Sequence, residues 1–435
     1  MGIVRESERY MKNLDDYKVD NLFLLIGENP LPNYVAARTL LNESGTVYLV
    51  FTNQTKSQKN CLKNRNVLQQ HNIKTCEVYL ENDGSNAYEI HKKIQKKCLK
   101  LPNTQTLGLN YTGGTKAMAV HAYRTIQECN PNADAVFSYL DSRTLKMWID
   151  REGNQPLQFD VTLDPPLNLE TLFKLHNNNE WLDNKPPRSE PVLPEIEAKF
   201  AEFHRNEKLK KEWRNWCGQK LHPLTKEKTK VGFKWKEEDD LNCTPPIRIR
   251  LNGLSESIKK ILRENLDTST ENLQLNITKQ KGFDSLTHVC EWLDGTWLES
   301  YVLQQVKEIQ NKFGIKESMM SFHVRDSQKT WRERFEFDVA FIKGYQLFAI
   351  SCTTSSEKDL CKQKLFEAHL RARQLGGDEA RVALVCCYDF PEYIKDEVRF
   401  AIPDKKIQVF GRQDLANLAD GIDDWIDRNN QEANR

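Results

Sequence analysis

Three acidic residues in the last third of the chain are spaced so that they can act together. Glu336 and Asp338 lie in the apolar run FEFDVAFI (335–342), and because strand side chains alternate between faces, both carboxylates leave the same face. Glu299 lies upstream, in a segment with helical spacing of apolar residues. Convergent carboxylates suit Mg²⁺ or Mn²⁺, and such an ion can activate water for phosphodiester cleavage. The alternative is an edge strand whose acidic residues face solvent.

A second apolar segment is expected to run past these acids. After a turn at Lys343 and Gly344, residues 345–354 read YQLFAISCTT. The pattern predicts a strand that pairs with the first one as a hairpin. This pairing places Ser351, Cys352 and Thr353 near the acidic residues, so Ser351 and Thr353 join the candidate catalytic residues.

Another candidate site lies at LGLNYTGGTKAMAVHAY (107–123). The pattern predicts a short strand, a turn containing Gly113 and Gly114, and then a helix. Paired glycines there leave amide groups open, and with the positive end of the helix dipole they form a seat for an anion, most often phosphate. Thr115 adds a hydroxyl and Lys116 a positive charge. The alternative is a tight turn before a capped helix, because the spacing matches neither the P-loop nor the dinucleotide fingerprint.

Strands and helices alternate over residues 21–163, and this alternation positions the glycine turn. The predicted strands cover residues 21–26, 46–52, 75–82, 107–110, 135–141 and 144–150, the last two joined by Ser142 and Arg143 as a hairpin. Such alternation predicts a doubly wound α/β sheet whose ligands lie at the carboxyl ends of the strands. The other loop residues expected at that edge are Gly27, Glu28, Asn29, Thr52, Asn53, Gln54, Asn82 and Asp83.

The acidic hairpin belongs to a second set of elements with a different order. Helical spacing at 296–313 precedes a short predicted strand, SFHV, and then the hairpin itself. A long predicted helix, KDLCKQKLFEAHLRARQL, and the apolar strand RVALVCCY follow, before a late strand and a polar helical tail. We expect an α/β domain with a mixed sheet over 281–435, after the doubly wound domain over 1–163.

Residues 164–280 are expected to form a helical and irregular connector. A polar, proline-rich section is followed by the basic and aromatic runs KLKKEWRNW and KEKTKVGFKWKEE. Basic residues interleaved with aromatics can bind single-stranded nucleic acid. The alternative is a solvated helix whose aromatic side chains pack against the body of the protein.

Composition narrows the class of protein. A length of 435 residues predicts two or three domains, and 39% hydrophobic with 29% charged residues is typical of a globular protein. No apolar run approaches a membrane span and the first residues lack a signal-peptide core, so we expect a cytoplasmic protein without membrane contact. The eleven cysteines show no metal-ligand spacing, which favours reduced thiols. A net charge of +1 means that any nucleic-acid contact comes from local patches.

The two motifs together resemble a known family. The phrases GTWLESYV and FEFDVAFIKGYQLFAISCTT resemble the PD-(D/E)xK nuclease core of CRISPR ancillary nucleases. Those proteins also carry an N-terminal CRISPR-associated Rossmann-fold (CARF) domain, and LNYTGGTKAMA is similar to its ligand loop. In that family the loop binds cyclic oligoadenylate at a dimer interface. The resemblance covers about 21–163 and 281–415 and leaves the middle unmatched.

The resemblance implies roles for individual residues. Glu299, Glu336 and Asp338 would bind Mn²⁺ or Mg²⁺ and act in catalysis. A two-fold symmetric ring of adenylates implies a homodimer. The residues implied to bind the cyclic oligoadenylate are Glu28, Asn29, Thr52, Asn53, Asn110, Thr112, Gly113, Gly114, Thr115 and Lys116.

One departure from the family pattern concerns the catalytic lysine. The second strand of that nuclease family ends in E-x-K or S-x-K, whereas here Ser351 is followed by Cys352 and Thr353. Thr353 supplies no positive charge, so catalysis is lost or the ammonium comes from elsewhere. Lys362 and Lys364, on the following helix, are the candidates because a lysine stem can reach back across one turn; the alternative is that both are surface lysines.

Two hypotheses about function follow. The first is a nuclease for DNA, RNA or both, activated by cyclic oligoadenylate (cyclic tetra-adenylate is expected) in type III CRISPR antiviral defence, with ligand binding in one domain controlling a distinct active site in the other. The second is a cyclic-oligoadenylate sensor whose degenerate nuclease domain binds nucleic acid or a partner without cleavage. A third, slow cleavage of its own ligand, lacks a clear general base near Gly113.

Overall fold

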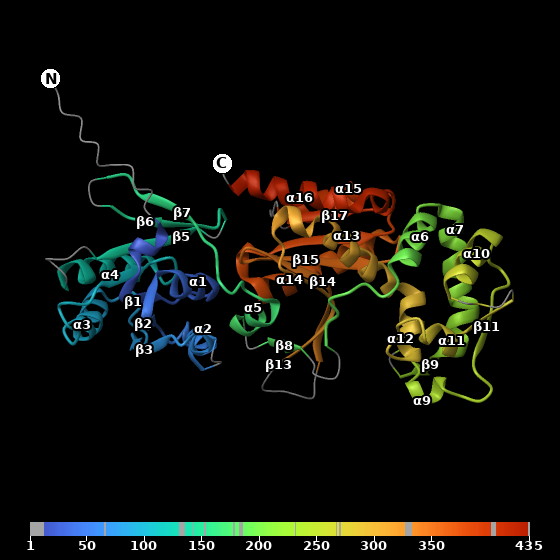
Figure 1. Cartoon of the computed structure of the whole chain (residues 1–435), viewed down its shortest axis with the longest axis horizontal. Helices are drawn as coiled ribbons and strands as arrows, with labels where there is room; N and C mark the ends of the chain where they lie inside the picture. Colours follow the sequence, from blue (N-terminus) through green and yellow to red (C-terminus); the bar gives the residue numbers. More distant parts are fainter. Residues whose placement is uncertain are drawn as a thin grey trace, which may run out of the picture.

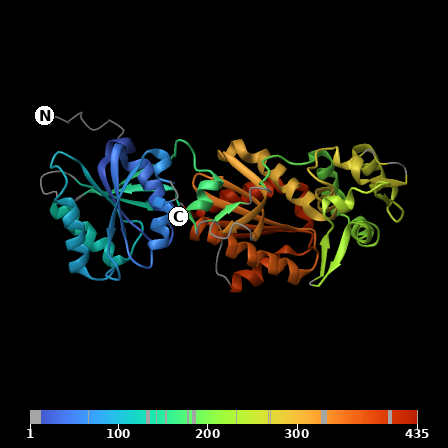
Figure 2. The ribbon, with the colours of Figure 1, turned by 90° about the horizontal axis from the view of Figure 1, so that it is seen from below.

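The computed structural model describes residues 13–64, 67–129, 135–141, 143–151, 154–176, 179–181, 186–230, 232–266, 268, 271–326, 333–401 and 406–433. Three parts lie in a row along the long axis (Figure 1): the N-terminal α/β domain, the C-terminal α/β domain, and helices from the middle of the sequence. The view from below shows the same order (Figure 2). Spatial order therefore differs from chain order, because the middle of the chain folds at the far end.

The N-terminal domain is the predicted doubly wound α/β sheet. Its seven strands have the order β3-β2-β1-β4-β5-β6-β7. The first five are parallel, whereas β5, β6 and β7 pair antiparallel. The strands are β1 (Val19–Leu25), β2 (Leu41–Phe51), β3 (Lys74–Tyr79), β4 (Leu107–Asn110), β5 (Val136–Asp141), β6 (Lys146–Ile149) and β7 (Leu157–Asp160).

Helices cover both faces of this sheet. Because side chains alternate along β1, Leu22 and Leu24 pack on one face and Phe23 and Leu25 on the other. The first face carries α1 (Leu31–Leu40) and α2 (Lys56–Asn64), and the second carries α3 (Ala87–Cys98) and α4 (Lys116–Cys129).

The observed elements agree closely with the predicted ones at the glycine turn. The strand at 107–110 is confirmed and α4 follows it directly. The predicted terminal hairpin exists as β5 and β6, but Ser142, in its expected turn, lies outside the described residues. The third antiparallel strand, β7, was not predicted, because Leu157–Asp160 is too short to show a clear alternation.

The C-terminal domain contains the predicted mixed sheet, whose strand order is β17-β16-β15-β14-β13-β8. Strands β8 to β15 pair antiparallel, and β15, β16 and β17 are parallel. The strands are β8 (Asn179–Trp181), β13 (Glu317–Asp326), β14 (Glu333–Lys343), β15 (Gln346–Thr353), β16 (Arg381–Cys386) and β17 (Ile407–Phe410). The helices that accompany this sheet are α13 (Trp297–Phe313), α14 (Lys358–Gly376), α15 (Pro391–Ala401) and α16 (Leu418–Ala433).

Residues 186–293 form the distal part, which is mostly helical. Its helices are α6 (Pro194–His204), α7 (Glu207–Trp216), α8 (His222–Thr225), α9 (Glu238–Leu241), α10 (Glu256–Leu266), α11 (Leu275–Lys279) and α12 (Leu286–Glu291). A small hairpin of β9 (Lys226–Thr229) and β10 (Gly232–Trp235) accompanies them, as does a separate antiparallel pair, β11 (Arg248–Arg250) with β12 (Asn272–Gln274), whose strands flank α10 in the chain. Trp213 and Trp216 are buried in a cluster shared with α13 and β15. For KLKKEWRNW, the structure therefore gives a helix whose aromatic side chains pack against the body.

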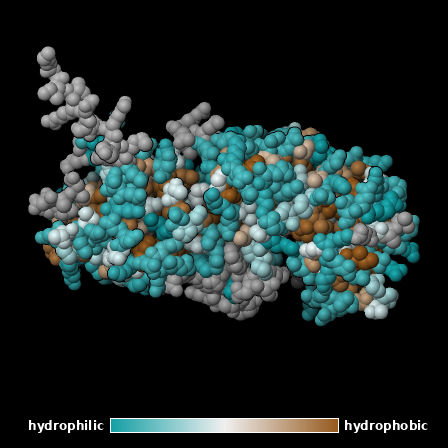
Figure 3. Space-filling view, in the orientation of Figure 1, coloured by the Kyte–Doolittle hydropathy of each residue, from teal (hydrophilic) through white to brown (hydrophobic). Residues whose placement is uncertain are grey.

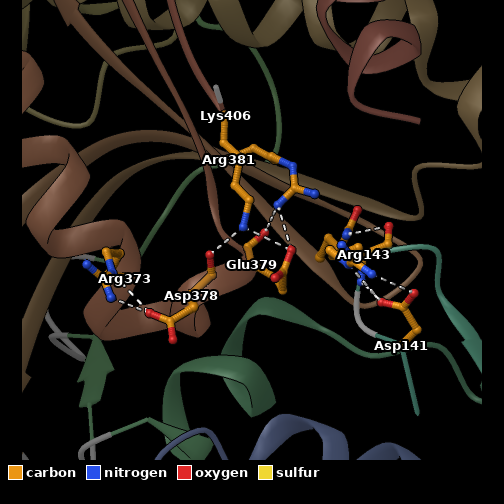
Figure 4. Close-up of polar contacts among 8 residues, drawn as sticks. Asp141, Arg143, Arg373, Asp378, Glu379, Arg381 and Lys406 are labelled. Carbon is orange, nitrogen blue, oxygen red and sulfur yellow. Dashed lines mark hydrogen bonds and ion pairs between the residues drawn. The ribbon is translucent and has the colours of Figure 1, made fainter. Parts of the chain in front are cut away.

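The junction between the two α/β domains is a continuous hydrophobic contact. A single buried cluster runs from Leu24 of β1, through Leu172 and Phe173 of α5 (Leu169–Leu175), to Leu347 of β15. Beside it, Gln346 Nε2 donates to the carbonyl of Arg143 at 3.4 Å. Figure 4 shows Arg143 and Asp141 lying next to a network of charged residues at the start of β16. The two domains thus share one hydrophobic core, with polar contacts between them at its edge.

Among the described residues, no helix combines the length and the apolar character that crossing a lipid bilayer requires. The face shown in Figure 3 is mostly hydrophilic, and hydrophobic residues gather on it where the distal helices meet the C-terminal domain.

Candidate functional site

A groove of about 1250 Å³ separates the C-terminal sheet from the distal part. One wall comes from α13 and the strands, and the other from residues 186–192, 214, 235 and 282–296. The residues on the sheet side are Glu299, Ser321, His323, Glu336, Cys352, Thr353, Thr354 and Lys364. Most of the predicted catalytic residues therefore lie around one cavity.

Glu299 is a buried carboxyl group. It lies in the first turn of α13, directly after a π-helical turn (Trp292–Thr296), and is only 7% exposed. Its Oε2 accepts a hydrogen bond from Ser321 Oγ at 2.9 Å. Burial raises the pKa of Glu299 well above its ordinary value, and the charges of Asp338 and Glu336 raise it further. The three acids therefore lie close enough to repel one another.

Asp338 is held in place by the neighbouring strand. Its Oδ2 accepts hydrogen bonds from the backbone N–H of Cys352 at 2.6 Å and from Ser351 Oγ at 2.8 Å. Burial raises the pKa of Asp338, whereas the charge of Lys364 and these two hydrogen bonds lower it. Ser351 thus serves the site by fixing the orientation of Asp338.

Glu336 lies at the outer end of the acidic strand. Its side chain is 49% exposed, and His323 Nε2 lies 3.9 Å from its Oε1. The two residues face each other across β13 and β14. Glu336 is therefore placed at the mouth of the groove, while Glu299 lies deeper and Asp338 lies behind the lining, against Ser351 and Cys352.

The structure separates the two candidate lysines. Lys364 lines the groove, and its charge lowers the pKa values of both Glu299 and Asp338. Lys362 instead pairs with Glu397 at 3.0 Å and with Asp359 at 3.3 Å, outside the groove. The helix places these lysines two residues apart, about 200° around its axis, so only one of them can face the acids.

The carboxylate oxygens of Glu299, Glu336 and Asp338 are of the type that binds a hard cation, but their side chains are not arranged around a common point. Carboxylate oxygens are the ligands that Mg²⁺ and Mn²⁺ prefer, and the mutual repulsion of Glu299 and Asp338 would be relieved by a cation. Yet among the described residues, no group of three or more His, Cys, Asp or Glu side chains is arranged to hold a metal ion. Metal binding by Glu299, Glu336 and Asp338 therefore stays a prediction.

The glycine turn is built by close backbone contacts. A Cβ on Gly113 would lie 2.8 Å from the backbone nitrogen of Gly27, so the turn presses against the end of β1. Gly114 has φ +75°, a conformation that favours glycine. Thr115 Oγ accepts from the backbone N–H of Met118 at 3.1 Å and caps α4. Exposed Gly114, Thr115 and Lys116 then form the surface of the turn.

Three of the predicted ligand-binding residues make contacts within the domain. Asn110 is fully buried, and its Nδ2 donates to Ser138 Oγ at 3.1 Å. Thr112 Oγ accepts from the backbone N–H of Leu140 at 2.7 Å. Thr52 is buried and its backbone N–H donates to Thr55 Oγ at 3.1 Å. Asn110 thus faces the interior while Thr112 is half-buried, and the contact of either side chain with ribose or base stays a prediction.

The remaining loop residues divide into two groups. Glu28 and Asn53 are exposed at the sheet edge, and Asn53 Nδ2 donates to Asn82 Oδ1 at 2.7 Å. Asn29 points toward the C-terminal domain, where its Oδ1 lies 3.0 Å from His176 Nε2. The same oxygen accepts from the backbone N–H of Leu31 at 3.0 Å. Asn29 is thus a junction residue.

Several residues around these sites were missed by the sequence analysis. His176 ends α5 and lies buried at the junction, and Ser321 and His323 face the acids from β13. No local pattern marks these three. Lys226 and Trp235, in contrast, belong to the basic and aromatic run, whose composition was a signal.

Two family models match this chain, one in each α/β domain. Residues 22–164 match the Card1 CARF domain family, and residues 288–429 match the family of the Card1-like endonuclease domain. No curated protein sequence matches this chain.

Three solved structures resemble the chain. Protein VC1899 from Vibrio cholerae has 15% identity and a TM-score of 0.69, with coverage of 94% of this chain and 98% of that chain. Can2 from Sulfobacillus thermosulfidooxidans, solved in complex with cyclic tetra-adenylate, has 16% identity and a TM-score of 0.66, with coverage of 95% and 99%. A type III CRISPR defence DNA nuclease activated by cyclic oligoadenylate has 16% identity and a TM-score of 0.52, with coverage of 85% and 45%.

Proposed function

Since the chain belongs to the Card1-like CRISPR ancillary nucleases, with a CARF domain followed by an endonuclease domain, we propose that it is a metal-dependent nuclease switched on by cyclic oligoadenylate. Its substrate is DNA, RNA or both, and its activator is cyclic tetra-adenylate. The observation that carries the proposal is that Glu299 and Lys364 line one groove and that both interact electrostatically with Asp338 beside it.

The activator binds at the exposed surface of the glycine turn. Open amides at Gly114 and Thr115 and the charge of Lys116 suit a phosphate at the start of α4. One turn further along the helix, Val120 is 55% exposed. A second copy of the chain that covers Val120 would bring two such turns together, which suits a two-fold symmetric ring.

The groove residues have separate roles in cleavage. Ser351 and the backbone of Cys352 orient Asp338, and Lys364 stabilises the negative charge that develops on the phosphate. Glu299 and Asp338 would hold a divalent cation, with Glu336 at the mouth. When bound, that cation supplies a Lewis acid and lowers the pKa of a water molecule. Lys364 thus takes the role that Thr353 cannot fill.

A chain of contacts connects the two sites. The turn at Gly113 presses on Gly27, and two residues later Asn29 contacts His176 and the backbone of Gly377. Gly377 directly follows α14, the helix that carries Lys364. A shift of the β1 loop on ligand binding is therefore transmitted to the position of Lys364, which couples two distinct sites.

A cleavage assay tests this function. Single-stranded RNA, single-stranded DNA and plasmid are incubated with the protein and Mn²⁺, with and without cyclic tetra-adenylate. We expect ligand-dependent cutting of at least one substrate and its loss in Asp338→Ala. Absence of cutting of every substrate, or equal cutting by the variant, would overturn the enzyme assignment.

A second candidate function is a sensor whose nuclease domain binds without cutting. The threonine at position 353 favours it, as does the absence, among the described residues, of a preformed group of metal ligands. Calorimetric titration with Mn²⁺ separates the two functions. A nuclease binds Mn²⁺ through its carboxylates and loses binding in Glu299→Gln, whereas a degenerate site shows no carboxylate-dependent heat.

A further inference from the structure

One face of the hairpin formed by β9 and β10 combines lysines with aromatic rings. Lys226 pairs with Trp235 and Lys228 pairs with Phe233 in the antiparallel register. Opposed residues, and residues two apart, project from the same face of a ladder. All four side chains therefore share one face, which we name the Lys-aromatic face.

The inner end of the Lys-aromatic face reaches the catalytic groove. Trp235 lines the groove, and Lys226 Nζ lies 4.0 Å from the centre of its ring. Lys226 Nζ also pairs with Asp294 Oδ2 at 3.0 Å, and Arg214 Nη1 pairs with Asp294 Oδ1 at 3.0 Å. Two cationic side chains thus surround one carboxylate on the wall opposite the acids.

The outer end of the Lys-aromatic face is open to solvent. Phe233 is 73% exposed and Lys228 is exposed beside it. An aromatic ring left in water next to a lysine is unexplained by packing, since neither belongs to the buried clusters. The other face of the same hairpin is satisfied internally, because Lys234 pairs with Glu227 at 2.9 Å.

We propose that the Lys-aromatic face binds single-stranded nucleic acid and guides it into the groove. Lysines contact the phosphates, and the rings stack with bases, which must be unpaired to be reached. The strand then enters the groove past Trp235 and reaches the opposite wall, which holds Glu299 and Lys364. The guidance role rests on the proposed nuclease function, whereas the binding itself does not.

Binding is measured without cleavage, so that the two proposals are tested separately. The Asp338→Asn protein is titrated, with cyclic tetra-adenylate present, against fluorescein-labelled DNA and RNA strands of about 20 nucleotides and against the matching DNA duplex, and anisotropy is recorded. The test variants are Phe233→Ala and Lys228→Ala. Lys234→Ala is the matched control, because it removes the same charge from the opposite face of the same hairpin.

We expect Phe233→Ala to weaken single-strand binding at least about fivefold, the lower end of what one stacked base contributes. Lys228→Ala reduces the slope of the logarithm of the binding constant against the logarithm of the salt concentration by about 0.7. The affinity of Lys234→Ala stays within about twofold of that of the protein with an unchanged hairpin. The duplex binds less tightly and is insensitive to Phe233→Ala. Equal loss in all three variants, or duplex binding that depends on Phe233, would overturn the proposal.

The outcomes separate this inference from the proposed nuclease function. If the Lys-aromatic face variants lose binding while the unmodified protein cuts nothing, the inference stands and the nuclease function fails. If the unmodified protein cuts and the variants bind as it does, the inference fails and the nuclease function stands.

Discussion

His176 Nε2 and Asn29 Oδ1 lie 3.0 Å apart across the junction of the CARF and endonuclease domains. Asn29 belongs to the loop that contacts the glycine turn, and His176 ends the helix between the two domains. On the other side of Asn29, the backbone of Gly377 marks the end of α14. This small contact is thus a point where a movement of the ligand loop reaches the endonuclease domain.

Replacing Asn29 with alanine tests whether this residue acts at the junction or at the ligand. The change removes the contact with His176 and the hydrogen bond from Leu31 N–H. We expect ligand-stimulated cutting to fall about tenfold, since coupling between sites is worth about 1–3 kcal/mol. Cyclic tetra-adenylate affinity, measured by calorimetry, changes far less than in Lys116→Ala. A loss of affinity as large as in that variant would make Asn29 a ligand contact.

Lys364→Met removes the ammonium group that faces the acids. We expect cutting to fall about 10²–10³-fold, as for loss of one donor that stabilises a developing charge. Lys362→Met is the matched control, because this lysine lies two positions away and pairs with Glu397 outside the groove. Rates are compared under single-turnover conditions. Similar rates for both variants would show that the positive charge comes from another residue.

Asp338→Asn separates catalysis from stability. Burial raises the pKa of Asp338 above its ordinary value, so its charged form destabilises the folded protein as pH rises through that pKa. Asparagine has no charge, and its amide oxygen still accepts from Ser351 and Cys352. We expect the variant to lose cutting and to unfold at a higher urea concentration at pH 8. Unfolding of the variant at a lower urea concentration would mean that hydrogen bonds and the charge of Lys364 offset the cost of burying the Asp338 carboxylate.

Lys116→Ala probes the activator site on an exposed residue. The substitution removes one charge at the start of α4 and leaves the buried core unchanged. We expect the affinity for cyclic tetra-adenylate to fall about tenfold or more, because charge-assisted hydrogen bonds contribute about 1.5–3 kcal/mol. Lys92→Ala, on the neighbouring helix α3, is the control and retains the affinity. Calorimetry measures both, and an unchanged affinity in Lys116→Ala would exclude this lysine.

His176→Gln tests the effect of pH on the junction. Burial lowers the pKa of His176 from 6.5 to about 4, so between these values the unfolded chain binds more protons than the folded one. The contribution of the neutral His176 ring to the free energy of unfolding is fully present above pH 6.5. It is lost as pH falls toward 4, by at most about 1.4 kcal/mol per pH unit. We therefore expect urea unfolding to show that, as pH falls from 6.5 to 4, the free energy of unfolding of His176→Gln rises relative to that of the unmodified protein. A constant difference at all pH values would mean that the pKa is not lowered.

The parts that sequence predicted well are those fixed by local pattern. The apolar residues before Gly113 form a strand because they alternate into buried faces, and the paired glycines permit the close approach that follows. The acidic hairpin likewise has the expected register, in which Asp338 lies beside Ser351. Local spacing decides these features, so no knowledge of distant contacts is needed.

Side-chain direction at the ends of elements was predicted less well. Asn110 ends its strand, and the register with β5 turns its side chain inward to Ser138. Helical geometry shows that Lys362 and Lys364 face different ways, but packing of α14 on the sheet decides which one reaches the acids. The place of residues 186–293 depends on packing between distant segments, such as Trp213 against Leu293, and so has no local signature.

The edge strand β8 and the distal helices precede α13 in the chain, although they border the sheet that α13 covers. A ribosome therefore synthesises the CARF domain, the junction helix and the groove's outer wall before it adds Glu299 or Asp338. Because domains generally fold in order from the N-terminus during synthesis, the groove is complete only after the strands of the endonuclease domain have been made. A nascent chain consequently carries a folded CARF domain before its endonuclease domain is complete.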